Sequence, residues 1–203
     1  GQFCIGSAGG VNITATTSYT EEPATAGAAV NITLKGMKGG HSGLEIHLGR
    51  ANANKLMARI VKAAIAQTGA RLATWHGGNM RNAIPYECST VMTVAADKVE
   101  QLKALVADFK ALFESEFAEI EDNIDLTATT VDMPAKQLTA ADEKRILAAI
   151  LGCHNGVLRQ IPSFPSVVET SSNLAIIDIA EGKVNVRILA RSARESTKEY
   201  ITD

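Results

Sequence analysis

The chain has 203 residues, of which 46% are hydrophobic and 21% charged, with a formal net charge of −2. This is enough for one well-packed core or for two smaller cores that share an interface, and no apolar run is long enough to span a bilayer. The near-neutral charge and an aromatic content of only 4% argue against nucleic acid or an anionic membrane as partners.

The first two thirds of the chain alternate between strand-like and helix-like patterns. Short apolar or alternating stretches predict strands at 11–19, 28–38, 70–76, 83–95 and 124–131. Apolar residues recur at helical spacing over 54–67, which Gly69 ends, and over 98–121. Because only a polar turn separates the first two strands, we expect them to pair as a hairpin.

The last third continues with the same two patterns. Thr139 and Asp142 predict the start of a helix that ends near Gly152, and an irregular segment is expected over 154–165. Strands at 173–179 and 183–190 should form a hairpin, and residues 192–195 resemble a capping box before a last helix. These elements predict an α+β fold: an antiparallel sheet with helices packed on one face, ferredoxin-like and possibly doubled.

The two ends of the sequence also lead to an expectation. The chain opens on strand-like residues without a Met, and it closes inside a helical pattern that has no stop signal. We therefore expect a piece of a longer protein, with a natural domain that has frayed ends as the alternative.

A glycine-rich loop around one histidine is the best candidate for a functional element. It comprises residues 38–43, Lys-Gly-Gly-His-Ser-Gly, between a predicted strand and a predicted helix. Glycines let the backbone turn tightly and approach a neighbour closely, so His41 can face a cleft. A surface turn with an ordinary imidazole is the competing interpretation.

Metal binding by this chain alone is not supported by the sequence. His41, Glu45 and His47 could be imagined as ligands, but their spacing fits neither a helical His pair nor a zinc ribbon. Cys4 and the other two cysteines, Cys88 and Cys153, form no Cys-x-x-Cys pair. They are expected to be reduced, mostly buried thiols of a cytoplasmic protein.

Other polar side chains stand at the ends of predicted strands. Asn82 lies at a strand entrance, where it could bind a ligand or merely form a turn. Arg191 ends the last strand and could clamp a carboxylate through two hydrogen bonds, or remain a solvated edge charge. Residues 169–172, Glu-Thr-Ser-Ser, could line a cleft or simply precede the next strand.

Six stretches, taken in order, carry a resemblance that covers nearly the whole chain. They are 39–47, 52–56, 81–85, 94–99, 168–171 and 191–192. Together they resemble aminoacyl-histidine dipeptidases, the carnosinase-like Xaa-His dipeptidases of the di-zinc exopeptidase superfamily.

The resemblance implies a catalytic domain that is interrupted by an inserted lid, or dimerisation, domain. Residues 1–10 would be the strand that leaves the catalytic domain, 11–192 the lid, and 193–203 the start of a helix. The ligands of the two zinc ions and the general-base glutamate would lie in the flanking halves of the parent enzyme, so this fragment would hold no zinc and be inactive alone. Partners would be a dipeptide substrate, the catalytic domain of the same chain, and possibly a second copy.

The resemblance also assigns roles to individual residues. His41 matches the lid histidine that stabilises the oxyanion of the reaction, in its own site or a partner's, and Asn82 matches a residue that contacts substrate. Arg191 would hold the free carboxylate of the dipeptide, with Thr170 and Ser171 as polar wall. Two alternatives are a stand-alone ferredoxin-like module for ligand binding or dimerisation, and a self-sufficient hydrolase that uses His41 with Glu45.

Overall fold

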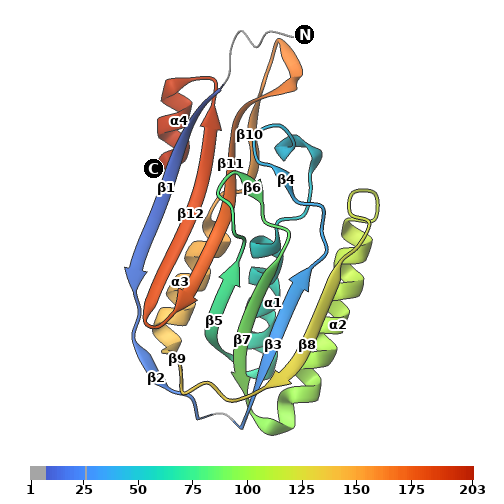
Figure 1. Cartoon of the computed structure of the whole chain (residues 1–203), viewed down its shortest axis with the longest axis vertical. Helices are drawn as coiled ribbons and strands as arrows, with labels where there is room; N and C mark the ends of the chain where they lie inside the picture. The colour runs from blue at the N-terminus through green and yellow to red at the C-terminus, as the bar shows by residue number, and fades with distance from the viewer. Residues whose placement is uncertain (1–7, 26) are drawn as a thin grey trace.

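The alternating segments form one large sheet in the computed structural model, which describes residues 8–25 and 27–203. Its strands are β1 (Gly9–Ser18), β3 (Ala28–Lys35), β5 (Arg71–Gly77), β7 (Cys88–Val94), β8 (Asp125–Val131), β10 (Gly156–Ile161), β11 (Phe164–Ala180) and β12 (Lys183–Ser192). All pairs are antiparallel, in the order β1-β12-β11-β5-β7-β3-β8, with β10 added on β11 (Figure 1). The expected antiparallel α+β fold is confirmed.

Residues 28–131 form a ferredoxin-like unit within this sheet. The chain runs through β3, α1 (Ala53–Thr68), β5, β7, α2 (Val99–Glu116) and β8. The spatial order β8-β3-β7-β5 places the fourth strand of the unit beside the first, as in the ferredoxin-like arrangement. Asn52 caps α1 by accepting a hydrogen bond from the Lys55 N–H, and Gly69 ends it at a φ of 69°.

The other half of the sheet extends this unit without repeating its strand order. It contains β1, β12, β11 and β10, with α3 (Ala140–Gly152) and α4 (Glu195–Thr202). Only three residue pairs, Ile177–Gly77, Asp178–His76 and Ile179–Trp75, join β11 to β5. We call this junction the seam; it connects two halves that each have their own strands and helices.

Three sequence predictions about this half are wrong. The strand at 11–19 does not pair with β3, because β1 lies along β12 over ten residue pairs and caps the far edge of the sheet. The segment 154–165 is not irregular, since β10 and a much longer β11 form a hairpin there. The capping box is absent, because the Ser192 hydroxyl accepts from the Arg194 N–H rather than from a residue of α4.

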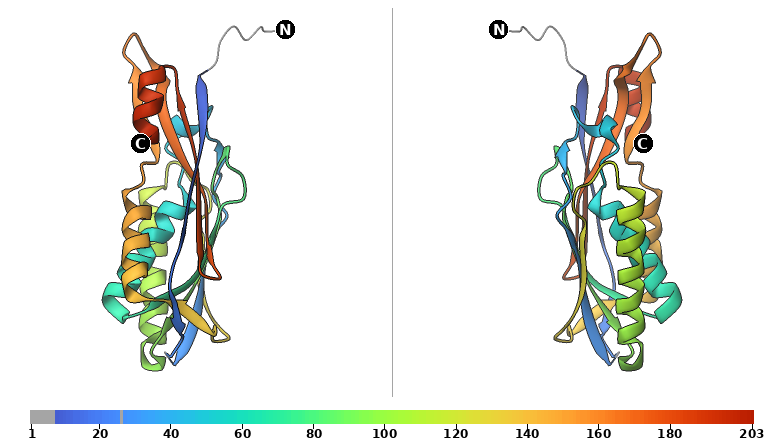
Figure 2. Two further views of the ribbon diagram at one scale, coloured as in Figure 1. Left: turned by 90° about the vertical axis from the view of Figure 1, so that its left-hand side faces the viewer. Right: turned by 90° about the vertical axis from the view of Figure 1, so that its right-hand side faces the viewer.

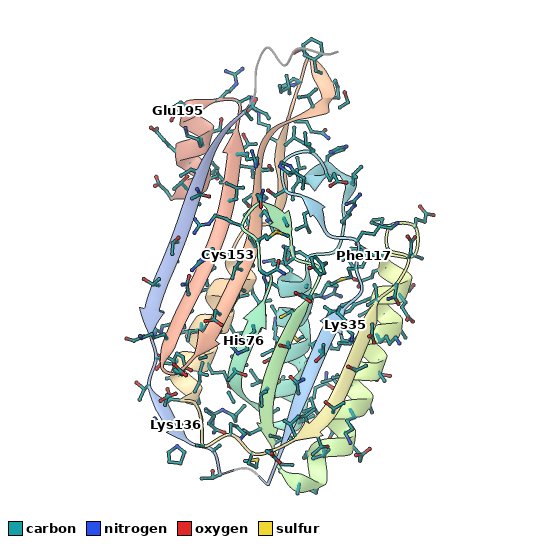
Figure 3. The ribbon with its side chains drawn as sticks, in the orientation of Figure 1. Lys35, His76, Phe117, Lys136, Cys153 and Glu195 are labelled. Carbon is teal, nitrogen blue, oxygen red and sulfur yellow. The ribbon has the colours of Figure 1, made fainter. Side chains whose placement is uncertain are left out.

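The helices cover one face of the sheet, as predicted (Figure 2). The core between the two layers is formed by β-branched and leucine side chains of the strands with the apolar stripes of α1, α2 and α3. Burial of such side chains is the main source of stability of the fold. The opposite face is more polar; there His76 of β5 is exposed and its Nδ1 lies 2.5 Å from Asp178 Oδ1 of β11 (Figure 3).

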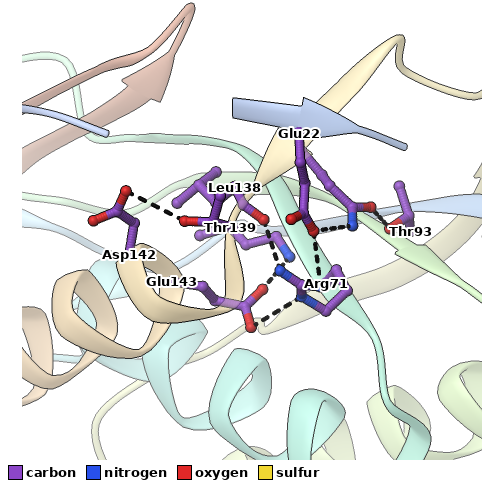
Figure 4. A network of polar contacts seen from close by, with 9 residues as sticks. Glu22, Arg71, Thr93, Leu138, Thr139, Asp142 and Glu143 are labelled. Atoms are coloured by element: carbon purple, nitrogen blue, oxygen red, sulfur yellow. Dashed lines mark hydrogen bonds and ion pairs between the residues drawn. The ribbon is translucent and has the colours of Figure 1, made fainter. Parts of the chain in front are cut away.

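A partly buried arginine, Arg71, connects the lower end of the sheet to α3. The guanidinium of Arg71 donates to the carbonyl of Leu138 at 2.7 Å and forms ion pairs with Glu22 and Glu143 (Figure 4). Glu143 also accepts from the Leu72 N–H at 2.6 Å. Burial raises the pKa of Glu143, and Arg71 opposes that shift.

Candidate functional site

The predicted glycine–histidine loop forms a small two-stranded ladder at one end of the sheet. β4 (Gly40–His41) pairs with β6 (Ala83–Ile84), which places His41 opposite Ala83. The Ser42 N–H donates to the carbonyl of Asn82 at 2.9 Å. The strand predicted at 83–95 is thus divided into β6 and β7, with Pro85 in the break. Asn82 is exposed and adjacent to the histidine loop.

Close contacts explain two glycines of this loop. Gly40 has a φ of 128°, and a Cβ there would collide with Arg50 Nη1 and lie 2.6 Å from Glu45 Oε2. A Cβ on Gly43 would lie only 2.9 Å from Arg191 Nε. Glycine therefore allows three charged side chains to approach the backbone, two on one side of the histidine and one on the other.

The imidazole of His41 is held in one orientation. Its Nδ1 accepts hydrogen bonds from the backbone N–H groups of Gly43 and Leu44, each at 3.0 Å. A ring nitrogen that accepts carries no proton, so the neutral ring has its proton on Nε2. The half-buried His41 thereby presents an Nε2–H donor.

An ion pair braces the loop behind the histidine. Glu45 Oε2 accepts from the His41 N–H at 2.7 Å, and Glu45 Oε1 lies 2.8 Å from Arg50 Nη2. Arg50 Nη1 donates to the carbonyl of Gly39 at 2.7 Å. The hydrogen bond from His41, together with the charge of Arg50, lowers the pKa of Glu45.

Arg191 lies beside the same loop, although 150 residues separate it from His41. It stands near the end of β12, opposite Ser171 of β11 and Gly10 of β1. Its Nε is buried and has no hydrogen-bond partner within the described residues. In the guanidinium that packs on Gly43, Nε therefore donates no hydrogen bond to any described protein group.

Thr170 and Ser171, which were expected to form a polar wall of the substrate site, are not on the surface. Both are buried in β11, and the Thr170 and Ser192 hydroxyls are hydrogen-bonded to each other at 2.9 Å. Asn173, further along the strand, donates to the carbonyls of Arg81 and Ala83 and so attaches the Asn82 turn to β11. The sequence did not identify Asn173 or Arg50 as parts of the site. No sequence pattern distinguishes Asn173, whereas the position of Arg50 close to the loop in sequence could have suggested a contact with it.

Glu169 and His47 were two further candidates from the sequence. The first is held in ion pairs and the second is exposed on the surface. Glu169 is 2% exposed and pairs with Arg159 and Arg194, so it joins the β10–β11 hairpin to the start of α4. His47 is exposed on η1 (Ile46–Leu48). The imagined metal set His41, Glu45 and His47 is not assembled, and across residues 8–25 and 27–203 no three His, Cys, Asp or Glu side chains could hold an ion.

Two of the three cysteines are described, and both are free thiols. Cys88 is buried and Cys153 is partly buried. Burial raises the pKa of each thiol, which keeps both in the unreactive protonated form. Cys4 lies outside the described residues. In the part of the chain that the structure describes, no helix is long and apolar enough to cross a membrane.

Comparison with known proteins places this arrangement in a family. Residues 32–121, which fall within the ferredoxin-like unit, match the family described as "Peptidase dimerisation domain". The ferredoxin-like unit is therefore similar to the dimerisation domains of peptidases. It is also 37% identical over 202 residues to the cytosol non-specific dipeptidase of Escherichia coli (strain K12), covering 99% of this chain and 42% of that protein.

A solved structure matches nearly the whole chain and not only the ferredoxin-like unit. The aminoacylhistidine dipeptidase from Vibrio alginolyticus superposes with a TM-score of 0.93 at 37% identity, over 96% of this chain and 40% of that one. The resemblance stated from the sequence motifs is thereby confirmed. The chain spans about two fifths of the length of both relatives.

Proposed function

We propose that this chain is the lid and dimerisation part of a cytosolic dipeptidase. The observation that carries the proposal is the environment of His41, whose Nδ1 accepts two backbone N–H groups and whose Nε2–H is left to donate. A fixed donor of this kind can stabilise an oxyanion that forms as a peptide carbonyl is attacked. The 37% identity to two dipeptidases supports the same activity.

The substrate contacts follow from the neighbours of His41. Arg191 packs on the same loop, and its planar guanidinium suits the C-terminal carboxylate of a dipeptide. Asn82 contributes an exposed amide to the wall beside it. Thr170 and Ser171 line this wall only after a change in their packing, because both are buried. Xaa-His dipeptides are the proposed substrates, and the name of the Escherichia coli relative suggests a wider range.

The remaining machinery belongs, in this proposal, to the rest of a protein with the length of the relatives. Two zinc ions would supply Lewis acidity and an activated water there. This chain would contribute the oxyanion donor, the carboxylate clamp and a dimer contact with a second copy. Residues 1–10 and 193–203 would connect it to the catalytic domain.

Dipeptide hydrolysis and metal content of the longer protein test this proposal together. His41→Ala should lower kcat by roughly 10²–10³-fold, the usual effect of removing one oxyanion donor, and should leave the metal content unchanged. The matched control is His47→Ala, which removes an exposed imidazole six positions further on. Parallel loss of metal and turnover would make His41 a ligand, and undetectable hydrolysis by the unmodified protein would refute the dipeptidase assignment.

A further inference from the structure

We propose that Glu45 and Arg50 are positioning residues that hold His41 in its donor orientation. The inference rests on the proposed function of His41 and goes beyond it, because neither side chain needs to touch the substrate. Its basis is the set of contacts that the two side chains make with the backbone of the loop.

Glu45 binds both backbone polar groups of His41. Its carboxylate accepts from the His41 N–H at 2.7 Å, and its own N–H donates to the His41 carbonyl at 2.9 Å. The peptide units on either side of His41 are therefore fixed by one residue. Since the orientation of these units determines where the Cβ points, Glu45 also determines where the imidazole can lie.

Arg50 completes a closed ring of contacts around the loop. It contacts Glu45 through Nη2 at 2.8 Å and the carbonyl of Gly39 through Nη1 at 2.7 Å. The backbone from Gly39 to His41 is thus enclosed between one carboxylate and one guanidinium. A planar guanidinium can make both contacts at once, which a lysine ammonium reproduces poorly.

Apart from this brace, the loop is held by the short β4–β6 ladder and by the N–H groups of Lys38 and Ser42, which donate to Glu121 and to the Asn82 carbonyl. β4 has only two residues, and the glycines at 39 and 40 have φ values of 60° and 128°. Glycines retain large backbone freedom in the absence of such contacts. Without the brace, the His41 ring would no longer be held with Nδ1 toward the N–H groups of Gly43 and Leu44.

A comparable ion pair elsewhere in the chain provides the control. Arg59 of α1 and Glu116 of α2 form two hydrogen bonds at 2.6 and 2.7 Å, with side-chain exposures of 37% and 36%. The side-chain exposures of Arg50 and Glu45 are 19% and 35%. Both pairs join an arginine to a glutamate, but of the two only Arg50–Glu45 contacts the histidine loop.

Kinetics of the longer protein give the first test. Glu45→Ala and Arg50→Ala should each lower kcat by about 10–100-fold, because a small displacement of a donor has a large effect on the transition state, while KM changes less than about threefold. Glu45→Gln should recover part of the loss, since its amide oxygen can still accept from the His41 N–H. Glu116→Ala should leave kcat unchanged. Unchanged kcat in the Glu45 and Arg50 variants, or an equal loss in Glu116→Ala, would overturn the proposal.

Nitrogen NMR of the His41 ring in this 203-residue chain gives the second test, which requires no enzymatic activity. The unmodified chain should show an Nε2-protonated ring at a pH where it is neutral, and Glu45→Ala should show a mixture of both tautomers. Retention of a single tautomer in Glu45→Ala would refute the positioning role even if the dipeptidase assignment holds. If instead the tautomer changes as expected but the longer protein hydrolyses no dipeptide, the proposed function fails and the structural role of the pair stands.

Discussion

Asn54 connects the two halves of the sheet, and replacing it by alanine should be strongly destabilising. Its side chain is fully buried at the start of α1, where Oδ1 accepts from Trp75 Nε1 at 3.1 Å. Its Nδ2 donates to carbonyls of β5 and β11, at 3.3 Å for Ala175 and 3.4 Å for Gly77. Alanine would leave the buried indole N–H without its acceptor and would remove the amide contacts of these two carbonyls.

The magnitude follows from the number of groups left unsatisfied. One buried donor without a partner costs about 1–3 kcal/mol, and the weakened carbonyl contacts add to this, so we expect a loss of about 3 kcal/mol. For a chain of this size that corresponds to a decrease in Tm of about 6–12 °C. With a urea m-value of about 2–3 kcal/mol/M, the midpoint should fall by about 1 M at unchanged m.

Urea unfolding followed by far-UV circular dichroism measures this loss. Fluorescence of Trp75, the single tryptophan of the chain, is a second probe that reports directly on the seam. The control is Asn79→Ala, because Asn79 is exposed and its amide bonds Glu87 at 3.3 Å on the surface; we expect less than about 0.5 kcal/mol. Equal midpoints for the two variants would show that Asn54 does not stabilise the seam.

Three further predictions concern charge, backbone and substrate. Arg71→Met should destabilise the fold by about 3 kcal/mol, because it leaves Glu143 buried without its ion pair. Burial raises the pKa of Glu143, so the loss should grow as pH rises through that raised pKa, where the carboxylate ionises and has no ion-pair partner in the variant; a pH-independent loss in urea titrations at several pH values would exclude Glu143 as the cause. Gly40→Ala should lower kcat as Glu45→Ala does, because the added Cβ displaces Arg50, and unchanged turnover would show that the brace tolerates it. Arg191→Ala should raise KM for free dipeptides far more than for substrates with a blocked C-terminus, and equal effects would remove the carboxylate clamp.

Local patterns predicted most of the helices and strands but not all of the pairing. Within residues 28–131, elements that are close in sequence are also close in space. The hydrophobic periodicity and the turn residues were therefore sufficient to predict the helices and strands of this unit. β1 and β12 are distant in sequence, and no local signal in Val11 or Ile13 distinguishes β3 from β12 as a partner. The β10–β11 hairpin was missed because prolines at 162 and 165, close to its turn, are typical of irregular structure.

The candidate site could be predicted only in part for a similar reason. The glycines around His41 are visible in the sequence, and the motif resemblance pointed to Asn82 and Arg191. The direction of the imidazole depends on backbone N–H groups that no sequence pattern reveals. The contact of Arg191 with Gly43 depends on the register of β11 and β12, which periodicity alone does not fix.

The pairing of β1 with β12 has a consequence for synthesis. Gly9 pairs with Ser192 and Ser18 with Lys183, so β1 has no partner until the 164 residues between Ser18 and Lys183 have been made. The ferredoxin-like unit is complete by residue 131 and can fold in the meantime, since β3 pairs with β7 and β8, and β5 with β7, within residues 28–131, and only the seam with β11 forms later. During that delay an apolar strand would be prone to aggregate, and the threonines at 14, 16 and 17 keep this waiting strand polar.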